Sequence, residues 1–301
     1  MATHHGPVIA GKPEEGHGIA FKYTATASPN AGSNAVFKML LSQTVNELDD
    51  SMQEWVDPCN NFLMADTSGD IAYLTRGQIP IRSFANAWLP VPGWTGEHEW
   101  QGFIAHRHLP RIVNPESNMI VTANNRITDK DYPYYIALDF APEYRAKRIS
   151  DRLKKLKKAT VNDMESIHTE HISIPGKVFA ELFKSIQPVD EYSKFAMSQL
   201  EGWNGEMGAD MIAPTIYSAF RKRFNRRLIG RQFGDIAPLA FQGSGRGAQG
   251  HIGQLSSKLV TELAADMQSG SNALLQWQRI AIETLTAAIK DLREMLGDDI
   301  T

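Results

Sequence analysis

The sequence predicts an α+β chain in which residues 1–141 are rich in β-strands and residues 142–301 are mostly helical. Short apolar runs separated by Gly, Pro, Asn and Asp dominate the first part, as is typical of strands joined by turns. After Pro142, apolar residues recur every three or four positions, which indicates amphipathic helices. We therefore expect a β-rich part followed by a helical part, with the boundary near Ala141.

The first part contains one predicted helix among its strands. That helix ends before Asp57-Pro58, because proline disfavours helix at the residue before it. Turn residues in DTSGD between two apolar runs indicate a hairpin. In chain order, the expected elements are strands in PVIAG and GIAFKYTAT, a helix over 33–55, hairpin strands at 62–65 and 71–74, and a strand at 118–123 that leads into Asn124 and Asn125.

The second part is predicted to hold six helices joined by short connections. One segment, 243–253 (GSGRGAQGHIG), is expected to be a loop because of its glycines; it lacks the Lys-Ser/Thr of a phosphate-binding loop. The helices are expected over 143–155, 161–169, 177–186, 191–200, 213–228 and 272–296.

The composition is that of a globular protein and excludes several classes of partner. A formal net charge of −3 gives no reason to expect a nucleic acid, so the basic runs 145–158 and 221–231 are interpreted as solvated helix faces. No apolar run reaches the length of about 20 residues that spans a bilayer, so no membrane partner is expected. The single cysteine, Cys59, excludes an internal disulfide and is interpreted as a structural thiol.

Four phrases carry a resemblance to a known family. They are NNFLMADTSGDIAYLTRGQIPIR, LPVPGWTGEHEWQGFI, LPRIVNPESNMIVTANNRITDKDYPYY and APEYRAKRI, between residues 60 and 149. Taken in this order, they resemble the catalytic chain of penicillin acylases (penicillin amidases), a family of N-terminal nucleophile hydrolases. The resemblance implies an αββα sandwich, of which this chain would hold an interior part followed by the helical region.

The resemblance also implies an activity. Such enzymes are made as zymogens and cleave linear amide bonds with a serine that becomes the first residue after self-cleavage. This chain begins with Met1 and has no serine beside it, so we expect an interior fragment that is inactive alone and works with a missing N-terminal segment of the same precursor. The expected substrate is a small acyl amide, of the β-lactam or N-acyl-homoserine lactone class, and a periplasmic or secreted location is implied.

Two residues are the candidates for catalysis. The family's pattern places an oxyanion-hole donor on Asn124, the first Asn of TANNR, although an Asn pair also commonly caps a strand or turn. The family also places an arginine near the nucleophile and substrate, and the spacing from APEY favours Arg145 over Arg148. A solvated helix face is the simpler interpretation of either arginine.

Two metal sites are considered. The resemblance implies a structural calcium ion, for which Asp139 is the candidate ligand. Independently, Glu165, His168 and His171 follow one another at a spacing of three residues, so on a helix they could gather around zinc. A surface helix with two ordinary histidines is the favoured interpretation of this second group.

A non-catalytic binding module is the alternative function. Trp88, Trp94 and Trp100 are interleaved with Gly and Pro, which is one pattern of a carbohydrate-binding platform, although core packing explains tryptophans equally well. The resemblance instead makes His5 of HHGP a structural residue in a strand, and His98 is not needed as a base.

Overall fold

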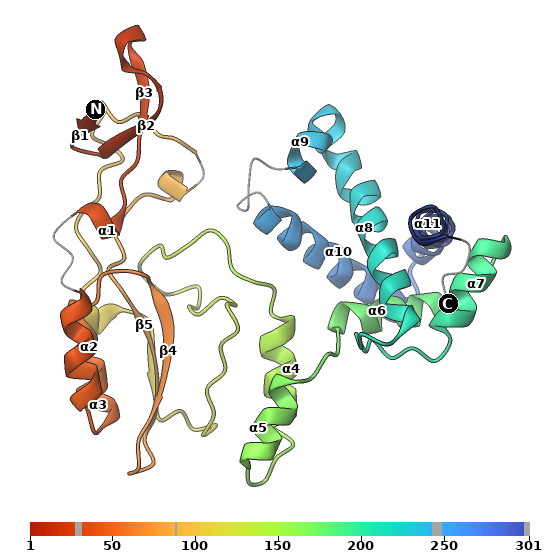
Figure 1. Cartoon of the computed structure of the whole chain (residues 1–301), viewed down its shortest axis with the longest axis horizontal. Coiled ribbons are helices and arrows are strands. Elements are labelled where there is room, and N and C mark those ends of the chain that lie inside the picture. Colours follow the sequence, from red (N-terminus) through yellow and green to blue (C-terminus); the bar gives the residue numbers. More distant parts are fainter. Residues whose placement is uncertain (28–31, 88, 243–248, 298–301) are drawn as a thin grey trace. The chain divides into compact units, whose positions relative to one another are not determined.

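The computed structural model describes residues 1–27, 32–87, 89–242 and 249–297 (Figure 1). The chain divides into two compact units, Met1–Phe140 and Ala141–Thr301. The first unit holds all six described strands, and the second is built from helices. The fold is therefore α+β, as the apolar periodicity of the sequence predicted.

The strands of the first unit form two antiparallel sheets, each with three strands. β1 (Ala2–Thr3), β2 (Gly6–Lys12) and β3 (His17–Ala20) form one sheet, in that order. The other sheet is formed, also in chain order, by β4 (Asn60–Ala65), β5 (Ile71–Arg76) and β6 (Arg111–Val113).

The predicted hairpin is confirmed by the pairing of β4 with β5, in which Leu63 lies opposite Tyr73. Its turn is held by Asp66, whose Oδ1 accepts hydrogen bonds from the backbone N–H groups of Ser68 (3.0 Å) and Asp70 (3.1 Å). The Ser68 hydroxyl and these amides lower the pKa of Asp66 to about 2. The carboxylate therefore stays charged and keeps the turn closed over the ordinary pH range.

The single helix predicted over 33–55 is wrong, because the structure breaks it in two. α2 spans Gly32–Leu41, and a separate helix, α3 (Val45–Ser51), begins after Thr44. Thr44 accepts a hydrogen bond from the Glu47 N–H (3.2 Å), and the Glu47 carboxylate accepts one from the Thr44 N–H (3.3 Å). This reciprocal capping box starts a new helix, and its Thr-x-x-Glu signature was present in the sequence.

The two helices bury different amounts of apolar surface. α3 packs against β4 and β5 (Figure 1). In contrast, α2 leaves large apolar side chains on its outer face, with Phe37, Leu40 and Leu41 between 73% and 78% exposed. α1 (Thr24–Ala27) is a single turn. The core of this unit is a cluster beneath the second sheet, made up of Val45, Met52, Met64, Ala72, Leu74, Ile79, Ile104 and Leu109.

The strand predicted over 118–123 is not formed. The segment runs without regular secondary structure toward the Asn pair. β6 ends at Val113, and Asn114 and Asn118 both have positive φ, 45° and 51°. These left-handed residues turn the chain away from the ladder that β6 makes with β5, so apolar composition alone misled the prediction.

The second unit is a set of eight described helices, and each of the six predicted helices is present. Two helices, α9 and α10, were not predicted; the N-terminal end of α10 falls in the Gly-rich segment 243–253, which was expected to be a loop. Residues 243–248 lie outside the described residues, whereas Gly253 lies within α10. In chain order the helices are α4 (Tyr144–Leu153), α5 (Val161–His168), α6 (Ile174–Lys184), α7 (Glu191–Leu200), α8 (Ile212–Phe233), α9 (Ala237–Gln242), α10 (Gln249–Ser269) and α11 (Ala273–Leu296).

An aromatic cluster joins these helices. Phe179 and Phe183 of α6 meet Phe220 and Phe224 of α8, and the edge-to-face pairs have ring centroids 5.0–5.2 Å apart. All four rings are at most 2% exposed. Edge-to-face packing adds to the apolar burial and fixes the two helices together. Within the described residues, no helix is long and apolar enough to cross a bilayer.

Candidate functional site

Asn124 is held in an unusual backbone conformation. Its φ is +62°, in the left-handed region that only a few per cent of non-glycine residues adopt. The residue is exposed and directly follows Ala123, which is buried. Asn tolerates this region better than most side chains, but the conformation still has an energetic cost, and such outliers gather at functional sites.

Asn125 holds the turn that presents Asn124. Its Oδ1 accepts a hydrogen bond from the Ala123 N–H (3.0 Å), and its Nδ2 donates one to the Arg126 carbonyl (3.0 Å). The side-chain amide of Asn125 is therefore engaged locally. The two asparagines have different structural roles, with the second fixing the backbone on either side of the first.

A chain of hydrogen bonds ties this segment to the β4–β5 hairpin. Asn61 Nδ2 donates to Thr122 Oγ1 (3.1 Å), and the Tyr73 hydroxyl donates to Asn61 Oδ1 (2.7 Å). Since Tyr73 has only one hydroxyl proton, Thr75 Oγ1 donates to it in turn (2.6 Å). Burial raises the pKa of Tyr73, which keeps that proton in place. The position of the Asn pair thus depends on buried residues of β5.

A second polar cluster lies at the turn between β1 and β2. His5 Nε2 contacts Glu99 Oε1, and Lys22 Nζ lies 3.2 Å from Glu99 Oε2. The hydrogen bond from His5, with that from Lys22, lowers the pKa of Glu99 to about 2. His5 was expected in a strand, but it lies in the turn before β2. Sequence reasoning missed Glu99 and Lys22, because contacts across 94 and 77 residues leave no local signal.

This cluster borders a cavity of about 570 Å³ in the first unit. Trp94, His98 and Trp100 line it together with His5 and Glu99. Trp94 is 87% exposed. Trp100 packs edge-on against Phe103, and Lys22 Nζ lies 5.2 Å from the centroid of its ring. Trp88 lies outside the described residues, so the three-tryptophan platform stays a prediction.

The two arginine candidates lie in α4 of the second unit. Arg145 is exposed in the first turn. Arg148 is ion-paired with Glu170 through two hydrogen bonds. Because Asn124 belongs to the first unit, the two predicted catalytic residues stand in different units.

The structure bears on only one of the two predicted metal sites. Asp139 is exposed, and no described group of three potential ligands from His, Cys, Asp and Glu includes it. Calcium also takes backbone and amide oxygens among its six to eight ligands, so the calcium site at Asp139 stays a prediction. The zinc group fails because α5 ends at His168, with Thr169 as its C-cap, which leaves His171 beyond the helix. His171 therefore does not share a helix face with Glu165 and His168, as the zinc site would require.

Cys59 does not have the surroundings of a nucleophile. Its Sγ lies 3.7 Å from the Gln78 carbonyl, and burial of the thiol raises its pKa. A reactive cysteine needs the opposite shift, toward the thiolate. The interpretation of Cys59 as a structural thiol is consistent with this environment.

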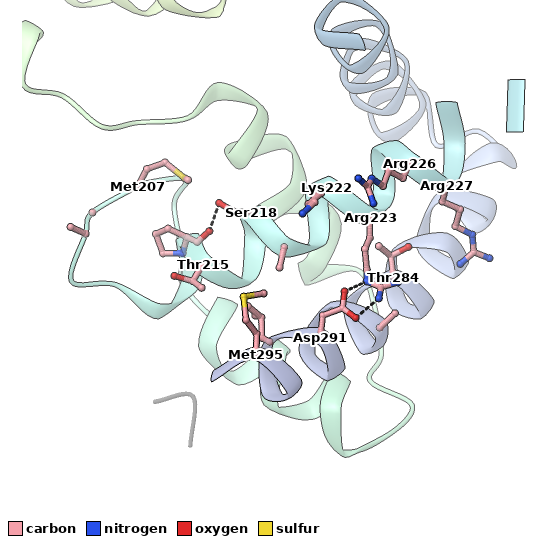
Figure 2. A pocket seen from close by; sticks show the side chains of 16 residues that line it. Met207, Thr215, Ser218, Lys222, Arg223, Arg226, Arg227, Thr284, Asp291 and Met295 are labelled. Carbon is pink, nitrogen blue, oxygen red and sulfur yellow. Dashed lines mark hydrogen bonds and ion pairs between the residues drawn. The ribbon is translucent and has the colours of Figure 1, made fainter. Parts of the chain in front are cut away.

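A cavity of about 1120 Å³ in the second unit lies between α8 and α11. Figure 2 shows Arg223 reaching from α8 to Asp291 of α11, with two hydrogen bonds joining them. The Arg223 guanidinium lowers the pKa of Asp291. Arg227 is likewise paired with Glu283. None of the residues predicted to carry chemistry lines this cavity, and much of its charge is neutralised by these pairs.

Comparison with known proteins gives consistent matches. The sequence model for "Penicillin amidase" matches residues 1–301. Penicillin acylase 2 proenzyme of Pseudomonas sp. (strain SE83) is 33% identical over 97% of this chain and 38% of its own length. Acyl-homoserine lactone acylase QuiP of Pseudomonas fluorescens is 21% identical over 99% of this chain and 39% of its own length. The chain thus spans about two fifths of these relatives.

A solved structure is similar across nearly the whole chain. Thermostable penicillin G acylase from Alcaligenes faecalis superposes with a TM-score of 0.73, at 18% sequence identity, over 99% of this chain and 58% of that one. The chain therefore shares the fold of a large part of that acylase, which agrees with the fold class that the resemblance implied.

Proposed function

Because this chain belongs to the penicillin amidase family, we propose that it supplies part of the active site of an amidohydrolase that cleaves a linear N-acyl amide. The names of its relatives, a penicillin acylase and an acyl-homoserine lactone acylase, support a small acyl amide as the substrate. The attacking serine is proposed to come from a segment outside these 301 residues. That segment of the same precursor is the proposed partner.

Asn124 is the proposed oxyanion donor. When a nucleophile adds to an amide, negative charge develops on the carbonyl oxygen, and a fixed N–H group beside that oxygen stabilises the transition state. The observation that carries this proposal is the left-handed backbone of Asn124, φ +62°, on a turn that Asn125 holds. An oxyanion donor needs a fixed backbone position of this kind, because it must not reorganise as the negative charge forms.

Arg145 is proposed to support the site with a permanent positive charge. A guanidinium stays protonated throughout the ordinary pH range and donates in a planar fork, which suits an acyl carbonyl or a carboxylate of the substrate. The alternative, Arg148, has its fork engaged with Glu170. The choice of Arg145 over Arg148 therefore rests on its spacing from APEY, which the resemblance to the family favours.

The test uses the complete protein that carries this sequence, assayed with a chromogenic phenylacetyl amide and with an N-acyl-homoserine lactone. Asn124→Gly is the decisive variant, because glycine adopts φ +62° without strain and removes only the side-chain amide. We expect kcat to fall by about 10²–10³ while KM changes much less.

Asn124→Ala should lower kcat at least as much. Asn125→Ala serves as the matched control, because it removes the neighbouring amide and should lower stability more than kcat. A near-normal kcat in Asn124→Gly would place the oxyanion donor elsewhere. Failure of the complete protein to cleave any acyl amide would overturn the proposed activity itself.

A further inference from the structure

Three potential metal ligands converge at the turn between β1 and β2. The side chains of His4, His5 and Glu99 each bring one ligand atom into a group whose members all lie within 4.8 Å of one another. His4 Nε2 lies 3.4 Å from Glu99 Oε1, and His5 Nε2 contacts the same oxygen. The two imidazole rings lie side by side, with centroids 3.7 Å apart.

We propose that His4, His5 and Glu99 bind a divalent transition-metal ion of the zinc class. Two imidazole nitrogens and one carboxylate oxygen are a common ligand set for zinc, which binds both atom types at about 2.0–2.2 Å. In a tetrahedral site, such bonds place neighbouring ligand atoms about 3.3 Å apart. The 3.4 Å between His4 and Glu99 already matches that separation.

The backbone that carries the histidines is fixed by its own hydrogen bonds. Thr3 Oγ1 donates to the Gly6 carbonyl (3.1 Å) and accepts from the His5 N–H (3.1 Å). The His5 ring also packs against Gly93, where an added Cβ would lie only 3.1 Å from its Cε1 atom. Gly93 therefore leaves room for the ring in its present position, and a larger residue there would displace a ligand.

The second carboxylate oxygen and the cavity complete the arrangement. Lys22 Nζ lies 3.2 Å from Glu99 Oε2, so it orients the carboxylate with its other oxygen toward the histidines. The 570 Å³ cavity lined by His5 and Glu99 leaves space for a water molecule as the fourth ligand. Because two of the three ligands are imidazoles, the site should select zinc or cobalt over calcium or magnesium, which prefer oxygen.

The first experiment is a titration of the metal-stripped 301-residue chain with Zn²⁺ in a calorimeter. We expect one Zn²⁺ site, which Ca²⁺ does not occupy. Its affinity for Zn²⁺ should fall at least tenfold in His5→Ala and in Glu99→Gln. His17→Ala is the matched control, since His17 is an exposed histidine of β3 outside the group. It should bind Zn²⁺ as the parent does. Circular dichroism of each variant checks that it has folded.

A second measurement reports on geometry. Co²⁺ in a tetrahedral site gives intense visible absorption bands, which should form with the parent chain and be lost in His4→Ala. Gly93→Ala, which keeps all three ligands but crowds the His5 ring, should weaken the bands. Unchanged Zn²⁺ affinity in His5→Ala or Glu99→Gln would overturn the proposal. If the affinity for Zn²⁺ fell as much in His17→Ala, the proposal would be overturned as well, because Zn²⁺ would then bind histidines in general.

Discussion

Arg148 and Glu170 form a two-pronged ion pair within the helical unit. Arg148 Nε donates to Glu170 Oε2 at 2.5 Å, and Nη2 donates to Oε1 at 2.6 Å. Arg152 Nη1 adds a third hydrogen bond to Oε1, also at 2.6 Å. One carboxylate just after α5 thus binds two arginines from successive turns of α4. The second arginine of APEYRAKR thus links α4 to the segment just after α5.

Removing this carboxylate charge should destabilise the helical unit. Glu170→Gln keeps the size of the side chain but leaves Arg148 and Arg152 without their anion, and we expect a loss of about 2 kcal/mol in the free energy of unfolding. Urea denaturation followed by circular dichroism measures it. Glu181→Gln is the matched control, because its pair with Lys184 is about 60% exposed on both sides. That change should stay within about 1 kcal/mol.

The same ion pair predicts an acid-dependent stability. The hydrogen bond from Arg148 lowers the pKa of Glu170 from 4.5 to about 2 in the folded chain. A lowered carboxyl pKa stabilises the fold fully above pH 4.5, and that contribution is lost as the pH falls toward 2. Urea midpoints of the parent should fall more steeply over this window than those of Glu170→Gln. If the urea midpoints of the two proteins fell in parallel with pH, the ion pair of Glu170 would not be the source of this acid dependence.

Tyr73→Phe should loosen the segment that carries Asn124. The change deletes the hydroxyl between Thr75 and Asn61, and we expect it to cost about 1–3 kcal/mol, because buried polar groups lose their partner. Amide hydrogen exchange of residues 120–125 should quicken. Tyr132→Phe is the control, since its hydroxyl donates to the His108 carbonyl instead. Unaltered exchange in Tyr73→Phe would show that the hydrogen-bond chain does not hold the segment.

Gly77→Ala should destabilise the first unit far more than Gly69→Ala. Both glycines have positive φ, 131° and 98°, so both substitutions strain the backbone. Only at Gly77 would the new Cβ meet other atoms, with the Cα of Cys59 at 2.9 Å and its Sγ closer still, whereas Gly69 has nothing within 4 Å. The difference in thermal midpoints between the two variants isolates the contact with Cys59. Equal midpoints would argue against that close approach.

Periodicity predicted six of the eight described helices of the second unit, because helices are set by local spacing, and it missed α9 and α10. The bounds of α7 match the prediction, and α11 begins one residue later than expected. Turn chemistry likewise predicted the β4–β5 hairpin. The errors have physical causes. Thr44 caps a new helix inside an apolar stripe, and positive φ at Asn114 and Asn118 prevents the strand expected over 118–123.

The candidate site could be predicted only where residues lie together in the sequence. Asn124 and Asn125 were singled out as a pair, but their different roles came from hydrogen bonds that no pattern encodes. The cluster of His5, Lys22 and Glu99 was missed, because the fold brings its members together from distant parts of the chain. Conversely, the zinc group failed because the helix ended one turn too early.

The exposed face of α2 has a consequence for how this chain behaves inside a producing cell. Phe37, Leu40 and Leu41 form an exposed apolar patch on the folded chain. At high concentration, an exposed apolar patch of this kind brings copies of the same chain together. Soluble yield should therefore rise when these three positions are made polar, without any change in the fold beneath them.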